Sequence, residues 1–178
     1  MNRQKSLVVF YSRTGTTKEI AGAISKKLEC DTEEIFTADN RKGFFGFMKC
    51  SYEAIFKKLP AIREINKNPA SYDIVIIGTP IWVGTMSSPI RTYLSQNSEY
   101  FKNVAFFCTH GGSGGSRAFG DVENIVAKKP LAVLELKQEE VREKDYSQKI
   151  EKFAEEVGNG ALNICIRDLR LDILTISK

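Results

Sequence analysis

Short apolar segments alternate with helical patterns along the chain, and this alternation limits the possible folds more than any other feature. The most distinct segment, residues 73–78, reads Asp-Ile-Val-Ile-Ile-Gly, with four consecutive β-branched apolar residues. A strand without polar alternation is typical of the centre of a parallel sheet, where helices cover both faces. The alternation therefore predicts βαβ units and an α/β fold.

Five strands are expected, each bounded by turn residues. They are residues 7–11, 32–36, 73–78, 104–108 and 131–135. A helix after the first strand is indicated by Ile20, Ile24 and Leu28, which recur at helical spacing. Further helices are expected over residues 89–95, 116–128 and 146–157, the last ending at Gly158-Asn159-Gly160. Together these elements predict a doubly wound three-layer sandwich with a five-stranded parallel sheet.

The length of 178 residues, with 42% hydrophobic and 27% charged residues, favours a single domain over residues 1–178. Its core is expected at residues 6–158, with an aromatic insertion at 37–60 and a C-terminal extension at 161–178. In the extension Leu169, Leu171 and Ile173 alternate with polar residues, which predicts an amphipathic strand after residue 164. That strand would cap the sheet edge or cross to a partner.

The aromatic insertion contains Phe44, Phe45, Phe47 and Met48 and leads into a helical pattern over residues 52–59. Since apolar side chains are mostly buried, a satellite core is the default interpretation. A lid over a ligand and a homodimer interface are the alternatives, because a large exposed apolar patch marks a contact surface.

Charge and cysteine content exclude several classes of protein. The net charge of +4 comes from basic residues scattered along the chain, which gives no indication of nucleic-acid binding. The apolar run after Met1–Lys5 is too short for a signal peptide or a membrane span, so we expect a cytoplasmic protein. The cysteines at 30, 50, 108 and 165 form no CxxC motif and are expected to be reduced thiols, and with one histidine no metal site is expected.

The first loop that indicates chemistry is Ser12-Arg13-Thr14-Gly15-Thr16-Thr17, between the first strand and the first helix. Its hydroxyls and backbone N–H groups at a helix N-terminus predict a phosphate site. The loop lacks GxxxxGK[ST] and an acidic residue for magnesium, which excludes a nucleoside triphosphatase. No cysteine precedes residue 30, and the central strand ends without Asp, which excludes a small phosphatase and a response regulator. The alternative is that Ser and Thr only cap the helix.

Two further loops follow the third and fourth strands, at the edge where ligands bind in open parallel sheets. The second, residues 78–86, contains the only tryptophan, Trp82, whose indole would stack on a flat ring or else be a half-buried packing residue. The third, residues 109–116, is rich in glycine but does not complete GxGxxG, so we expect its backbone amides to reach the edge of a planar ligand. His110 in this loop points to that ligand or is an ordinary exposed histidine.

At these residues the chain resembles a known family. Residues 10–18, Phe-Tyr-Ser-Arg-Thr-Gly-Thr-Thr-Lys, resemble the FMN phosphate loop of the flavodoxin family. Residues 78–86 and Arg91-Thr92-Tyr93-Leu94 resemble the flavin-ring loop of flavodoxin-like NAD(P)H:quinone reductases. The resemblance implies a flavodoxin-like fold and FMN as the cofactor.

By this resemblance, three sets of residues would bind FMN. The phosphate would lie against Ser12, Thr14, Gly15, Thr16 and Thr17, with Arg13 in the same loop and Lys18 beside it, either of which would bind the phosphate or face solvent. The isoalloxazine would lie against Thr79, Pro80, Ile81, Trp82, Val83, Gly84, Thr85 and Met86, with a backbone hydrogen bond near Gly84 to the flavin N5 edge. The pyrimidine end would lie against Thr109, His110, Gly111, Gly112, Ser113 and Gly114.

The resemblance implies an electron-transfer protein, but two departures favour a reductase over an electron carrier. Flavodoxins that carry electrons are typically acidic, whereas this chain is basic and has no Asp or Glu from Cys108 to Gly120. A reduced anionic flavin would meet less repulsion there, which favours two-electron reduction. The hypothesis is therefore an FMN-dependent quinone or flavin reductase with NAD(P)H as donor. Since the flavin supplies the redox chemistry, no catalytic side chain is expected.

Two alternatives to the reductase stay open. One is a one-electron carrier flavodoxin that exchanges electrons with a redox partner protein rather than with a small-molecule quinone. The other is a flavin-free interaction module of the same fold, because a fold alone does not establish function.

Overall fold

The computed structural model describes residues 4–39 and 43–176. Five parallel strands form the sheet in the order β2-β1-β3-β5-β6. They are β1 (Ser6–Phe10), β2 (Asp31–Glu34), β3 (Ile74–Trp82), β5 (Asn103–His110) and β6 (Val133–Lys137). A short strand, β4 (Thr85–Met86), pairs antiparallel with the end of β3. The predicted α/β fold with a five-stranded parallel sheet is confirmed.

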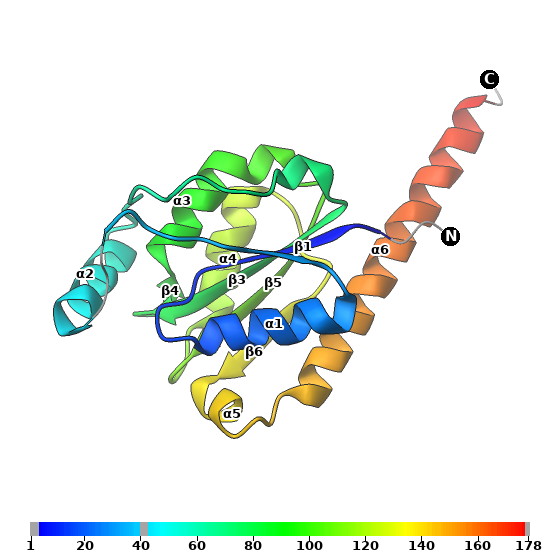
Figure 1. Cartoon of the computed structure of the whole chain (residues 1–178). Coiled ribbons are helices and arrows are strands. Elements are labelled where there is room, and N and C mark those ends of the chain that lie inside the picture. The colour runs from blue at the N-terminus through cyan, green and yellow to red at the C-terminus, as the bar shows by residue number, and fades with distance from the viewer. Residues whose placement is uncertain (1–3, 40–42, 177–178) are drawn as a thin grey trace.

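Helices cover both faces of the sheet (Figure 1). They are α1 (Thr16–Leu28), α2 (Gly43–Ile55), α3 (Ser88–Asn97), α4 (Gly115–Val126), α5 (Gln138–Arg142) and α6 (Ser147–Ile176), with the 3-10 turns η1 (Pro69–Ser71) and η2 (Ser98–Tyr100). Helices α1 and α6 lie on one face, and α3 and α4 lie on the other. The predicted three layers are therefore present.

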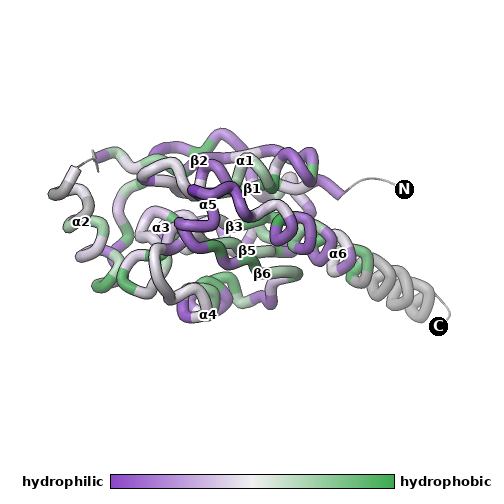
Figure 2. The backbone as a smooth tube through the Cα atoms, turned by 90° about the horizontal axis from the view of Figure 1, so that it is seen from below, coloured by the Kyte–Doolittle hydropathy of each residue, from purple (hydrophilic) through white to green (hydrophobic). Residues whose placement is uncertain are grey.

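Two hydrophobic cores lie on the two faces of the sheet because successive residues of a strand point in opposite directions. Val9 and Ile77 pack in the cluster that contains Tyr93 of α3. Their neighbours Val8 and Ile76 pack in the cluster that contains Phe153 of α6. Figure 2 shows the hydrophobic central strands between more hydrophilic helices.

Strand β3 is longer than predicted and contains part of the predicted second loop. Its residues Thr79 and Pro80 pair with Cys108 and Thr109 of β5, and Trp82 pairs with Thr85 of β4. Strand β6 begins two residues later than predicted, at Val133, and is followed directly by α5, which the sequence reading missed. Residues of the predicted second loop therefore lie on the β3–β4 hairpin.

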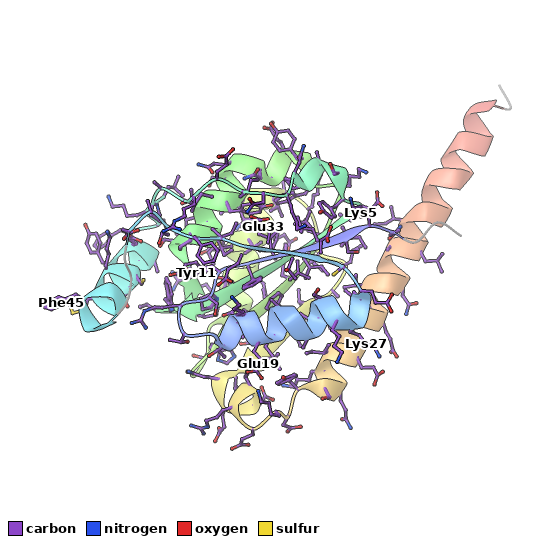
Figure 3. The ribbon with its side chains drawn as sticks, viewed as in Figure 1. Lys5, Tyr11, Glu19, Lys27, Glu33 and Phe45 are labelled. Atoms are coloured by element: carbon purple, nitrogen blue, oxygen red, sulfur yellow. The ribbon has the colours of Figure 1, made fainter. Side chains whose placement is uncertain are left out.

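The described side chains of the aromatic insertion do not support a satellite core. Helix α2 begins at Gly43 and ends at Ile55, so the helix predicted over residues 52–59 was placed too late. Phe45 is 86% exposed and Met48 is more than half exposed, whereas the side chains of Phe44 and Phe47 lie outside the described residues. In Figure 3 the Phe45 side chain lies on the side of α2 that faces away from the sheet.

The C-terminal strand was predicted wrongly. Helix α6 continues from Ser147 to Ile176 through Gly158 and Gly160, and extends beyond the sheet (Figure 1). The reason is visible in the apolar spacing, because Leu162, Ile166 and Leu169 recur at intervals of four and three residues, as on a helix. No helix within residues 4–39 and 43–176 is long and apolar enough to cross a membrane.

Candidate functional site

The first, second and third predicted loops meet at the carboxyl edge of the sheet and enclose a cavity of about 290 Å³. Ten of the predicted site residues line it, together with Gln138 of α5, which was not predicted. The lining consists of Arg13, Thr14, Thr16, Thr17, Pro80, Ile81, Trp82, Thr109, His110, Gly111 and Gln138. The carboxyl edge is where open parallel sheets bind ligands.

The N-terminus of α1 follows directly on the first loop, and no side chain caps its first backbone amides. Its N-cap residue is Gly15, which adopts a left-handed conformation with φ of 96°. The Ser12 hydroxyl accepts a hydrogen bond from Gly15 N at 3.1 Å, inside the loop rather than from the first turn of the helix. The alternative in which Ser and Thr only cap the helix is therefore wrong, and the helix N-terminus is suited to an anion.

The two cations of the first loop have different surroundings. Arg13 lines the cavity, and its Nη2 donates to the carbonyl oxygen of Gly43 at 2.8 Å, so this loop is joined to the start of α2. Lys18 instead forms an ion pair with Glu34 of β2 at 2.6 Å. Of the two, Arg13 is the one placed to meet an anionic ligand.

The second loop is a tight hairpin between β3 and β4. Its two turn residues, Val83 and Gly84, have φ angles of 48° and 72°, which is the pattern of a type I′ turn. A β-branched residue rarely adopts a positive φ, so Val83 is strained. Strain of this kind is concentrated at functional sites.

Trp82 fits both interpretations made from the sequence. It lines the cavity and is half-buried, and its ring contacts Tyr11 edge-to-face at a centroid distance of 5.6 Å. Tyr11 lies at the end of β1, next to the first loop (Figure 3). Packing against Tyr11 therefore holds the indole beside the cavity.

Buried hydrogen bonds support the β3–β4 hairpin. The Thr85 hydroxyl donates to Asp121 of α4 at 2.8 Å, and Arg91 Nη2 donates to Thr85 at 3.0 Å and to Asp121 at 3.2 Å. The Thr79 hydroxyl accepts a hydrogen bond from Ser87 N at 2.9 Å. Thr79, Thr85 and the buried Met86 do not line the cavity, so their contacts support the hairpin.

His110 in the third loop is buried at the cavity wall. Its Nε2 lies 2.9 Å from Glu135 Oε1, whereas its buried Nδ1 has no hydrogen-bond partner within the described part of the chain. A buried polar atom without a partner is costly, which makes Nδ1 a position for a ligand's hydrogen-bonding group. The neighbouring Thr109 hydroxyl bonds to the Thr17 hydroxyl at 2.8 Å, joining the third loop to the first.

Glu135 of β6 brings a carboxylate to the third loop, which has no Asp or Glu of its own from Cys108 to Gly120. Besides meeting His110, it accepts a hydrogen bond from Gly115 N at the start of α4 at 3.2 Å. A Cβ on Gly115 would lie 2.3 Å from the Glu135 carboxylate, so any other residue there would require the Glu135 side chain to move. The signal for Glu135 and Gln138 was their position near the carboxyl end of a strand adjacent to β5, at the ligand edge.

The second and third loops also touch each other through two glycines. A Cβ built on Gly114, whose φ is 115°, would lie 2.8 Å from the Cα of Gly84. Gly112, Ser113, Gly114, Val83 and Gly84 do not line the cavity, and Gly114 fixes the approach of the two loops.

A second cavity of about 700 Å³ adjoins the first loop on the side of α5. It shares Thr14, Thr16, Gly111 and Gln138 with the first cavity, and Gly15 also lines it. At its rim Lys144 forms an ion pair with Glu19 of α1, and the hydrogen bond from Lys144 lowers the pKa of the Glu19 carboxyl. Figure 3 shows Glu19 on the first turns of α1.

The fold and these loops define an α/β protein with a cavity at the carboxyl edge of its sheet. The family model for flavodoxins matches residues 5–152. The chain therefore belongs to the flavodoxin family.

Solved structures have the same fold. A flavoprotein from Lactobacillus acidophilus in complex with FMN has a TM-score of 0.64 and 23% identity, covering 79% of this chain and 97% of that chain. A WrbA-like flavodoxin from Agrobacterium tumefaciens has a TM-score of 0.56 and 14% identity over 88% and 97% of the two chains. The two-electron reduced flavodoxin of Megasphaera elsdenii has a TM-score of 0.54 and 16% identity over 88% and 97%. No curated protein matches the sequence.

Proposed function

We propose that the cavity binds FMN and that the chain is an FMN-dependent redox protein. The observation that supports this most is the combination of an uncapped helix N-terminus at Gly15 with a half-buried Trp82 on the wall of the same cavity. An N-terminus of this kind suits a phosphate dianion, and an indole suits a flat conjugated ring. The related fold of the Lactobacillus acidophilus protein, which was solved with FMN, supports the same assignment.

Different residues of the cavity would hold the phosphate and the ring of FMN. Backbone amides and hydroxyls of the first loop, with Arg13, would hold the phosphate, and Ile81 and Trp82 would lie against the ring. His110 Nδ1 would meet a polar atom of the ring, since Glu135 already occupies Nε2. FMN supplies the chemistry of accepting and donating electrons when it is bound.

Within this class, we favour a quinone or flavin reductase with NAD(P)H as donor. The basic net charge of +4 supports this role, because carriers of this family are typically acidic. Glu135 favours the alternative, a one-electron carrier with a protein partner, since it brings a carboxylate to the third loop. We expect the protein to act in the cytoplasm in either role.

The two roles are separated by one assay on the FMN-loaded protein. A reductase is expected to oxidise NADH or NADPH when a soluble quinone is present, with rates that saturate in both substrates. A carrier is expected to stay oxidised with either nucleotide and to be reduced only after a separate reductase is added. That second result would contradict the reductase role without affecting FMN binding.

A further inference from the structure

Helix α2 presents four large apolar side chains to solvent among those that the structure describes. Phe45, Met48, Tyr52 and Ile55 are each more than half exposed, and they recur at intervals of three and four residues along one face. Phe56 and Leu59, just after the helix, are also more than half exposed. We call these six residues the α2 apolar face.

The opposite side of α2 attaches the helix to the body of the protein. Cys50 and Ala54 are buried there, and the buried Glu53 carboxylate accepts a hydrogen bond from the Ser88 hydroxyl at 2.8 Å. Arg13 of the first loop binds the carbonyl oxygen of Gly43. The helix is therefore held with Cys50, Glu53 and Ala54 inward and the α2 apolar face outward, at one end of the molecule in both views (Figures 1 and 2).

The sequence that contains this face is basic. The insertion of residues 37–60 contains five basic and two acidic residues, which gives it a net charge of +3. Asp39 pairs with Lys49 at 2.7 Å, Lys57 pairs with Asp121 of α4 at 3.6 Å, and Glu53 is buried. Lys58 is exposed beside Leu59.

We propose that the α2 apolar face binds the surface of an anionic lipid bilayer, with α2 lying in the plane of the interface. A short helix with Phe, Met and Ile on one side and lysines beside them is the pattern of an interfacial helix. Anionic headgroups attract each basic residue near the surface, so the lysines add to the binding of the apolar side chains. This binding goes beyond FMN chemistry and does not depend on it.

A second copy of the chain fits the α2 apolar face less well. A two-fold contact would place the same patch of both copies together, and with it two segments of net charge +3. Like charges so placed repel, whereas an anionic surface attracts them. Charge complementarity thus favours lipid over self-association.

Co-sedimentation of the full chain with lipid vesicles tests this proposal. We expect binding to vesicles of equal parts phosphatidylglycerol and phosphatidylcholine, weaker binding at high salt, and little binding to pure phosphatidylcholine. Failure to bind the mixed vesicles would overturn the proposal, and equal binding to both compositions would overturn the anionic surface. Concentration-dependent dimerisation without lipid that Phe45→Ser abolishes would assign the face to a second copy instead.

Matched variants locate the binding surface. Phe45→Ser and Lys58→Glu are each expected to weaken binding to the mixed vesicles by about tenfold or more. Tyr100→Ser removes an aromatic side chain of η2 that is 49% exposed, and Lys152→Glu reverses an exposed lysine on α6. Neither is expected to change binding more than twofold, a bound of about 0.4 kcal/mol. Equal effects in the control variants would overturn the assignment to α2, and unchanged thermal melting checks that every variant is folded.

Discussion

Val83 is a β-branched residue in a backbone conformation that such residues rarely adopt. It has a φ of 48°, and its side chain is exposed at the tip of the β3–β4 hairpin. Asn tolerates the left-handed region better than a β-branched residue, so Val83→Asn should remove strain. We expect the free energy of unfolding of the apo protein to rise by about 1 kcal/mol in denaturant titrations. Val133→Asn, at an exposed strand residue, should lower it, and a loss in Val83→Asn would contradict the strain.

Asp121 determines how the hydrogen bonds that support the β3–β4 hairpin respond to pH. Burial raises the pKa of this carboxyl, but hydrogen bonds from Thr85 and Arg91 and the charge of Lys57 outweigh burial and hold the pKa below its ordinary 3.8. A lowered pKa stabilises the folded state fully above the unfolded value, and the contribution is lost as pH falls through the folded value. The hairpin is therefore expected to loosen in acid.

Asp121→Asn tests this charge. We expect it to cost about 3 kcal/mol at neutral pH, because it leaves the buried Arg91 guanidinium without its carboxylate. The difference from the unsubstituted protein should be constant above about pH 5 and shrink below about pH 4. Glu151→Gln, which breaks an exposed pair with Lys27, should not change the melting temperature measurably. A difference that stays constant down to strongly acidic pH would contradict the role of the charge.

Helices α6 and α2 differ in the burial of their phenylalanine side chains. Phe153 of α6 is 2% exposed in the core between α6 and the sheet, whereas Phe45 of α2 is 86% exposed. Phe153→Ala should therefore lower the free energy of unfolding by about 3 to 5 kcal/mol. Phe45→Ala should leave it nearly unchanged in denaturant titrations. A large loss in Phe45→Ala would show that α2 packs inward.

These two helices also mark the limit of prediction from sequence. The helix of residues 146–157 was recognised because one side of its pattern is apolar, and Phe153 is indeed buried. The exposure of Phe45 could not be predicted, because composition favours burial and only the attachment of α2 through Cys50 and Glu53 decides which side faces out. The end of α6 was missed because two glycines were given more weight than continuing helical spacing.

For the whole molecule, the sheet and the three loops were predictable because each strand is a local pattern and the ligand edge follows from strand order. Contacts between separate segments of the chain could not be predicted from the sequence. Glu135 reaches His110 from the next strand, and Gln138 reaches the cavity from α5, yet neither lies in a recognisable motif. The cavity therefore depends on side chains that only the assembled sheet brings together.

Titration of the apo protein with FMN and with riboflavin, followed by flavin fluorescence, tests the central proposal most directly. The two ligands share the ring and differ in the phosphate, which the N-terminus of α1 is proposed to hold. We expect both to be quenched on binding beside Trp82, with FMN bound at least about a hundredfold more tightly, a difference of about 3 kcal/mol. Equal affinity for both would contradict the phosphate site, and absence of quenching with FMN would contradict the proposed function itself.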